Sequence, residues 1–403
     1  MVIRMEKPGD SYLVWEKNGK NRGDLLFGRS LKDHGFGKVS MEDSINRDVG
    51  KLVFFLGKEK SGKPINLDTE MKITIVNALW NLLVGEELSL QDPKLLRIVK
   101  IIDDVAKQWR APKPLFLLFG NWAVELLEPS FQSMVSLGKA LEELIIPYIH
   151  AHKNQCQEEN NYFIDTYLKE IQKCKDRKSS FWGNRGEESL LASLMDLFLG
   201  GIETTSSTLS WGILYMLHHP DIQKRVQDEL DTVLDSKRQA TIEDKIKLPY
   251  TSAVINEIMR SSNIIPSAGR SITKAINVNG LAIPQGSFVV GNIKGMHKDP
   301  TIWKNPDLFD PTRFIDNDGS CKGSDKLINF STGKRSCPGQ TLAEKELFLF
   351  LVGLMQAFEF RPVQGRGLPS CSGFDVESNT RVVKCPPPYE VILIIREKSQ
   401  FSY

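Results

Sequence analysis

The most constraining feature of the sequence is a long run of helical character from Glu187 to His219. Apolar residues fall on most faces of the helix that this run predicts, so it should pass through the core and not lie along a surface. Pro220 ends the run and begins a second, charged amphipathic helix. We therefore expect a mainly helical protein built around one buried helix.

The remaining sequence predicts a mostly α fold with a minor β region. Between residues 266 and 290, β-branched residues interrupted by Asn279-Gly280 predict short strands and hairpin turns. The tail, residues 382–396, predicts a pair of terminal strands. Further helices are predicted where apolar residues recur every three or four positions: residues 65–108, 123–151, 249–262 and 340–358.

Composition excludes several classes of protein. The chain has 403 residues, of which 41% are hydrophobic and 25% charged, as in ordinary globular proteins. A formal charge of +2 lacks the basic excess of a nucleic-acid binder, so no nucleic-acid partner is expected. Six cysteines without a Cys-x-x-Cys pair argue against zinc ribbons and thioredoxin-like sites. No interdomain linker stands out, so residues 1–403 are expected to form a single domain without a membrane anchor.

The strongest chemical signal is the segment Phe330-Ser-Thr-Gly333-Lys-Arg335-Ser-Cys337-Pro-Gly339. It resembles the haem-ligand signature of cytochromes P450, Phe-x-x-Gly-x-Arg-x-Cys-x-Gly, at every fixed position. The resemblance implies that Cys337 is the thiolate ligand of the iron of haem b. Gly333 and Gly339 permit a tight turn and close approach to a flat cofactor; Arg335 can pair with a propionate and Phe330 can pack beside the sulfur. The alternative is a buried structural cysteine in a glycine-rich loop.

A second segment, Gly200-Gly201-Ile-Glu203-Thr204-Thr205, lies inside the long apolar helix and resembles the oxygen-activation segment of the same family. Two glycines in mid-helix cost roughly 1 kcal/mol each, and their lack of side chains would open room for dioxygen. Glu203 and Thr204 form an acid–alcohol pair that can relay protons. The alternative is a helix kink at which the threonine bonds back to the main chain.

A third pattern concerns charged residues around the cysteine loop. Glu257 and Arg260 lie three residues apart on one predicted helix face, which by itself indicates a surface salt bridge of little energy. They resemble the family's Glu-x-x-Arg, whose expected partner before the cysteine loop is Arg313, with a role in holding that loop. Arg270 takes the place where many animal members have a histidine against a haem propionate, and is expected to serve there.

The resemblance covers roughly residues 25–396 and is closest to animal microsomal, arthropod-like members. It implies a cytochrome P450 fold that is incomplete at the N-terminus, since an anchor, a first sheet and first helices, about 100 residues, have no counterpart. The family's Trp-x-x-x-Arg also has no match in the window Lys20–Asp24. A truncated gene product with exposed apolar surface and weak haem binding is therefore expected.

The resemblance implies a monooxygenase that inserts one oxygen atom from O2 into a lipophilic small molecule. NADPH–cytochrome P450 reductase would supply electrons from NADPH at the cytoplasmic face of the endoplasmic reticulum membrane. Two alternatives stay open: a non-catalytic, truncated haem-binding fragment, and a haem-thiolate isomerase that rearranges peroxides without a reductase. Glu203 and Thr204 argue against the isomerase, which needs no proton relay. Apolar residues are the candidates for the substrate pocket: Phe198, Leu199, Ile264, Ile265 and Ala268.

Overall fold

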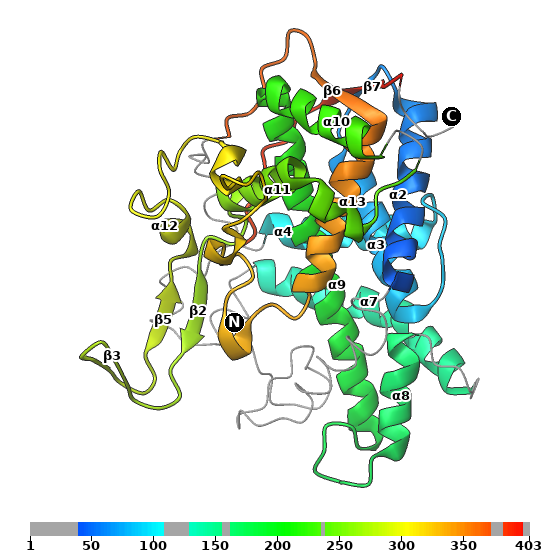
Figure 1. The fold of residues 1–403 in the computed structure, drawn as a ribbon. Coiled ribbons are helices and arrows are strands. Elements are labelled where there is room, and N and C mark those ends of the chain that lie inside the picture. The colour runs from blue at the N-terminus through cyan, green and yellow to red at the C-terminus, as the bar shows by residue number, and fades with distance from the viewer. Residues whose placement is uncertain (1–38, 109–128, 155–161, 235–237, 372–381, 398–403) are drawn as a thin grey trace.

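The computed structural model describes residues 39–108, 129–154, 162–234, 238–371 and 382–397. Most of these residues are helical, which confirms the predicted fold class (Figure 1). The α-helices are α2 (Val39–Lys60), α3 (Asp68–Val84), α4 (Pro93–Gln108), α7 (Pro129–Asn154), α8 (Phe163–Lys173), α9 (Gly183–His218), α10 (Pro220–Leu234), α11 (Pro249–Ser262), α12 (Ile293–His297) and α13 (Gln340–Ala357). Short 3-10 turns are η1 (Ile242–Lys247), η2 (Pro311–Phe314), η3 (Ser324–Lys326) and η4 (Gly333–Arg335).

The long buried helix is present as predicted. α9 has 36 residues and carries fully buried side chains such as Phe198 and Trp211. It packs against α3, α8, α11 and α13, so most of the core forms around it (Figure 1). α10 follows directly at Pro220, because a proline is tolerated in the first turn of a helix but not in its interior.

The β structure consists of small antiparallel sheets. β1 (Pro64–Ile65), β7 (Val391–Ile395) and β6 (Phe358–Pro362) form one sheet in that order. β2 (Ala268–Ser271) pairs with β5 (Phe288–Gly291), and β3 (Ile276–Val278) forms a hairpin with β4 (Leu281–Ile283). The hairpin turns at Asn279-Gly280, as predicted. These last two sheets extend away from the helical body (Figure 1).

Two predicted elements were wrong. Residues 65–108 form two helices, because Gly85 adopts φ +84° and its N–H closes α3 on the Asn81 carbonyl at 2.8 Å. The tail has no strand pair of its own within its described residues, 382–397: β7 pairs instead with β6 and β1.

The sheets β2–β5 and β3–β4 expose large apolar side chains. Phe288 is 64% exposed, Val290 54% and Leu281 68%. Exposed apolar surface was expected from the sequence. No helix among the described residues is both long and apolar enough to cross a bilayer. The window Lys20–Asp24 lies outside the described residues.

Candidate active site

Cys337 lies in a tight loop between η4 and α13. The main-chain N–H of Cys337 donates to the Phe330 carbonyl at 2.8 Å and closes the loop. The chain reverses at Gly333, whose φ of +75° costs a glycine no strain. Phe330 packs at the edge of the core, whereas the Cys337 side chain is exposed. The Cys337 side chain can therefore be reached from outside the loop, although the protein around it still desolvates the sulfur.

Two opposing effects act on the Cys337 sulfur. Desolvation by the surrounding protein raises the pKa of the Cys337 thiol, while the Gly339 N–H, bonded to the sulfur, opposes that rise. Gly339 also precedes the first turn of α13, whose positive end lies nearby. A cation at the sulfur would complete the stabilisation of the thiolate that the N–H begins.

The segment leading into the loop is held by two helices. The Ile328 N–H donates to Nε2 of His297 in α12 at 3.1 Å, and Asn329 Nδ2 donates to the Met259 carbonyl in α11 at 2.8 Å. His297 is fully buried, and its Nδ1 pairs with Asn263 Oδ1 at 3.2 Å. The position of the cysteine loop is therefore fixed relative to α11.

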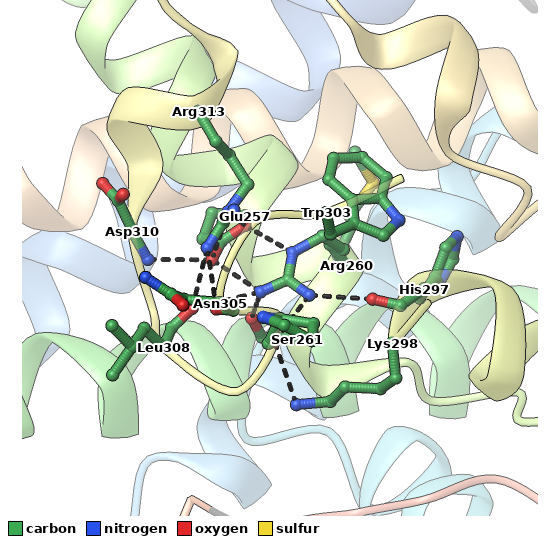
Figure 2. A network of polar contacts seen from close by, with 12 residues as sticks. Glu257, Arg260, Ser261, His297, Lys298, Trp303, Asn305, Leu308, Asp310 and Arg313 are labelled. Atoms are coloured by element: carbon green, nitrogen blue, oxygen red, sulfur yellow. Dashed lines mark hydrogen bonds and ion pairs between the residues drawn. The ribbon is translucent and has the colours of Figure 1, made fainter. Parts of the chain in front are cut away.

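Glu257, Arg260 and Arg313 meet as the sequence predicts (Figure 2). Glu257 and Arg260 are both 0% exposed and their charged groups are 2.7 Å apart, so the alternative of a surface salt bridge is wrong. Figure 2 shows the Arg260 guanidinium between Glu257 and the main chain of residues 297–308, to which it donates several hydrogen bonds. The centre of the Trp303 ring lies 5.4 Å from Cζ of the Arg260 guanidinium. Removing one partner of such a buried pair typically costs about 3–5 kcal/mol.

Arg270 reaches the cysteine loop from β2. Its Nη2 donates to the Arg335 carbonyl at 3.5 Å, and its Nη1 donates to the Gly269 carbonyl at 2.8 Å. Arg270 and Arg335 are both exposed. The structure thus brings the Arg270 guanidinium to the main chain of Arg335 in the loop, and guanidinium groups are suited to binding carboxylates.

The two glycines of α9 serve different purposes. A Cβ at Gly201 would lie 2.9 Å from Leu79 Cδ1, so the glycine lets α3 approach α9 closely. Among the described residues, nothing lies within 4 Å of a Cβ built on Gly200, which is exposed. The expectation that both glycines open room beside the helix is therefore corrected: Gly200 alone does so.

Glu203 and Thr204 are not brought together. The Thr204 hydroxyl donates to the Gly200 carbonyl at 2.6 Å, the back-bond of the alternative interpretation. Glu203 is 5% exposed and faces α3, where one carboxylate oxygen lies 3.2 Å from Lys72 Nζ. Its other oxygen accepts a hydrogen bond from Cys385 at 3.0 Å. Successive helical residues point about 100° apart, which explains the separation.

Comparison with known proteins identifies the family. A family profile described as Cytochrome P450 matches residues 26–393. The chain belongs to the cytochrome P450 family. Cytochrome P450 2J5 of Mus musculus is 35% identical over 336 residues, and Cytochrome P450 2J2 of Homo sapiens is 36% identical over 337. Each alignment covers 83% of this chain and 66% of the relative. Cytochrome P450 18a1 of Drosophila melanogaster is 32% identical over 375 residues, covering 89% of this chain and 68% of the relative.

The sequence-based recognition of an animal cytochrome P450 is therefore confirmed. The chain spans just under two thirds of the first two relatives, at 66% of their length.

Haem b is the cofactor of cytochromes P450, and the residues of this chain fit it. Cys337 offers an exposed sulfur with a main-chain N–H directed at it. Arg270 and Arg335 stand beside the same loop. α13, which follows the loop, packs on α9, where Gly200 leaves open space.

The residues predicted to line the substrate pocket differ in their burial. Phe198 is 0% exposed and its ring packs on Trp80 at 5.6 Å, so it belongs to the core and its assignment to the pocket was wrong. The others are partly exposed: Leu199, Ile264, Ile265 and Ala268.

Sequence reasoning missed the roles of His297, Lys72 and Cys385. A signal existed for Lys72, a charged residue within the largely apolar run of α3. Nothing in the sequence pattern indicated that His297 would anchor the cysteine loop. No signal marked Cys385, because its hydrogen-bond partners Glu203 and Ser207 lie far away in the sequence, on α9.

Proposed function

We propose that the chain acts as a haem-thiolate monooxygenase that inserts one oxygen atom from O2 into a lipophilic small molecule. The observation that carries this proposal is the exposed Cys337 sulfur, on a loop fixed through Ile328 and Asn329. A thiolate-ligated haem, when bound, supplies the centre at which dioxygen is activated. Cys337 would be its protein ligand.

Cofactor binding is assigned to the residues of the loop and to its neighbour on β2. Arg270 and Arg335 would pair with the propionates, because guanidinium groups match carboxylates in geometry. Phe330 would pack beside the sulfur, and Gly333 and Gly339 would keep the loop free of side chains where a flat group approaches.

Proton handling is assigned to Glu203 and Thr204. The Thr204 hydroxyl would hold a proton at Oγ1, on the side where Gly200 leaves space. To exchange protons with it, Glu203 must first leave the contacts that hold it on the α3 side.

Electrons are proposed to come from NADPH through NADPH–cytochrome P450 reductase. The protein would associate with the cytoplasmic face of the endoplasmic reticulum membrane. The formal charge of +2 supports the absence of a nucleic-acid partner.

The test is to express the chain and its Cys337→Ser variant and to record the ferrous–CO spectrum. The parent should bind haem and give the red-shifted band that thiolate ligation produces, and the variant should lose it. Cys321→Ser, which alters a partly buried cysteine bonded to Asn256, is the control and should keep the band. Survival of the band in Cys337→Ser would refute the assignment, and a parent without haem would favour the inert fragment.

One observation favours a second candidate, a haem-thiolate isomerase. Glu203 and Thr204 point to different sides of α9, so the pair that argued against an isomerase is not assembled. Reductant dependence separates the candidates. A monooxygenase needs NADPH and reductase for turnover, whereas an isomerase converts an organic hydroperoxide without either.

A further inference from the structure

A buried lysine ties three helices together beside the proposed site. Lys72 Nζ on α3 lies 2.6 Å from Asp103 on α4, 2.8 Å from Asp68 on α3 and 3.2 Å from Glu203 on α9. The side chains of Lys72 and Glu203 are each 6% exposed. Burial alone lowers the pKa of Lys72, but the three carboxylates outweigh it and raise that pKa well above its usual value. The ammonium is therefore a permanent cation in this cluster.

The other oxygen of Glu203 is held by a thiol. Cys385 Sγ lies 3.0 Å from Glu203 Oε1 and 3.2 Å from Ser207 Oγ. Burial and, to a lesser degree, the Glu203 charge raise the pKa of Cys385 to about 12. The thiol thus stays protonated and donates to the carboxylate; it is not a nucleophile.

These two contacts fix the direction in which the carboxylate points. Lys72 holds one oxygen and Cys385 the other, both away from Thr204. The groups around the carboxylate are Asp68 and Lys72 from α3, Asp103 from α4 and Cys385 from the segment before β7. α13 adds one more titratable group nearby, Glu346, which faces Thr205.

We infer that Lys72 is a positioning residue that holds the Glu203 carboxylate on the α3 side, withdrawn from Thr204, with Cys385 as its secondary support. Each proton transfer through Glu203 would then require the ion pair to open. This inference deepens the proposed function and rests on it for its catalytic consequence, but the contact between Lys72 and Glu203 can be tested without turnover.

The first test is a double-mutant cycle with Lys72→Met, Glu203→Gln and the double variant, measured by urea unfolding of the full chain. The two changes should be coupled by at least tenfold in the folding equilibrium, because Lys72→Met leaves the buried Glu203 carboxylate without its cation, a loss that cannot occur once Glu203→Gln is present. Lys173→Met, at a side chain 71% exposed, is the control and should show no coupling to Glu203→Gln. Additive effects at Lys72 and Glu203 would overturn the inference.

A second measurement reports the surroundings of the Glu203 carboxylate directly. Lys72→Met should shift the infrared carboxylate band that disappears in Glu203→Gln, because the ammonium beside that carboxylate is gone. Lys72→Arg should keep the band near its parent position, which a purely structural role would not require. Asp103→Asn leaves the pair of Lys72 and Glu203 in place and should not shift the band.

A third variant keeps the inference testable if Lys72→Met does not fold. Cys385→Ala removes only the thiol donor and should shift the same carboxylate band by less; an unshifted band in every folded variant would overturn the inference. In reductase-driven turnover, Lys72→Met and Cys385→Ala should each alter the amount of hydrogen peroxide released per NADPH consumed, while Asp103→Asn should not. Failure of the proposed function would appear separately, as loss of the thiolate-type CO band with the unfolding and infrared results intact.

Discussion

At the scale of single residues, the cysteine loop depends on a histidine that must stay neutral. Burial, aided by the nearby Arg260 charge, lowers the pKa of His297 to about 4. Its Nε2 accepts the Ile328 N–H, which is possible only while that nitrogen carries no proton. The geometry of the loop and the protonation of His297 are therefore linked.

This linkage predicts an acid-sensitive contribution to stability. A histidine titrates near 6.5 when unfolded, so as the pH falls from there towards about 4 the unfolded state takes up a proton that folded His297 does not. The free energy of unfolding should fall by on the order of 3 kcal/mol over that window. His297→Leu should flatten this slope in urea unfolding at several pH values and lower stability at neutral pH by about 1–3 kcal/mol, because Ile328 loses its acceptor. Exposed His150→Leu is the control, and an unchanged slope in His297→Leu would contradict the prediction.

At the scale of elements, the interface of α13 with α9 contains a carboxyl group without a hydrogen bond. Glu346 is 1% exposed, and among the described residues neither of its side-chain oxygens has a hydrogen-bond partner. Burial raises its pKa to about 8, and the nearby Thr205 hydroxyl only partly opposes this. The two helices thus pack around a neutral acid.

The expected effect of Glu346 on stability has the opposite sign to that of His297. Between about pH 4.5 and 8 the unfolded carboxyl ionises while the folded one stays protonated, so stability is lost as the pH rises. Glu346→Gln removes this titration, and its advantage over the parent should grow with pH to on the order of 3 kcal/mol near pH 8. Glu344→Gln on the same helix, where the side chain is only partly buried, is the control. Its free energy of unfolding should change with pH in the same way as that of the parent. If the free energy of unfolding of Glu346→Gln changed with pH as that of the parent does, the raised pKa of Glu346 would be refuted.

Elements defined by local pattern were predictable, and those set by distant partners were not. α9, α11, α13 and the hairpin at Asn279-Gly280 follow from periodicity and turn residues. The break at Gly85 was missed because one glycine within an apolar pattern does not by itself end a helix. The prediction of a strand pair within the tail was wrong because β7 pairs with β6 and β1, which no local pattern indicates.

The candidate site likewise has parts that were predictable from local sequence and parts that were not. The Cys337 loop and the contact of Glu257 with Arg313 follow from short motifs. The direction of Glu203 does not, because Lys72 lies on α3 and Cys385 in the segment before β7, and only the packing of these parts places both against one carboxylate.

At the scale of the whole molecule, the helical body is well covered but the projecting sheets are not. The β2–β5 and β3–β4 pairs together expose several large apolar side chains: Ile276, Val278, Leu281, Phe288, Val289 and Val290. Contiguous apolar patches of this kind promote association, more so when they lie on sheets of only two strands.

We expect the isolated chain to self-associate through these sheets as its concentration rises. Phe288→Lys combined with Val290→Lys should lower the mean mass in light scattering, because charges on exposed strands oppose edge pairing. Ile246→Lys changes a lone side chain that is 88% exposed and should have no effect. Equal association of the sheet variant and the parent would place the contact elsewhere.

The placement of Gly200-Gly201 within α9 has a mechanical consequence. α9 has 36 residues, about 54 Å at 1.5 Å per residue, and the two glycines stand at its centre. Glycine restrains the backbone of a helix less than residues with side chains do, and the Thr204 hydroxyl competes for the Gly200 carbonyl there. We therefore expect the helix around which the protein folds to be more flexible at its centre than in its two halves. Its amide hydrogens should exchange with deuterium from the centre outwards, although helices normally fray from their ends.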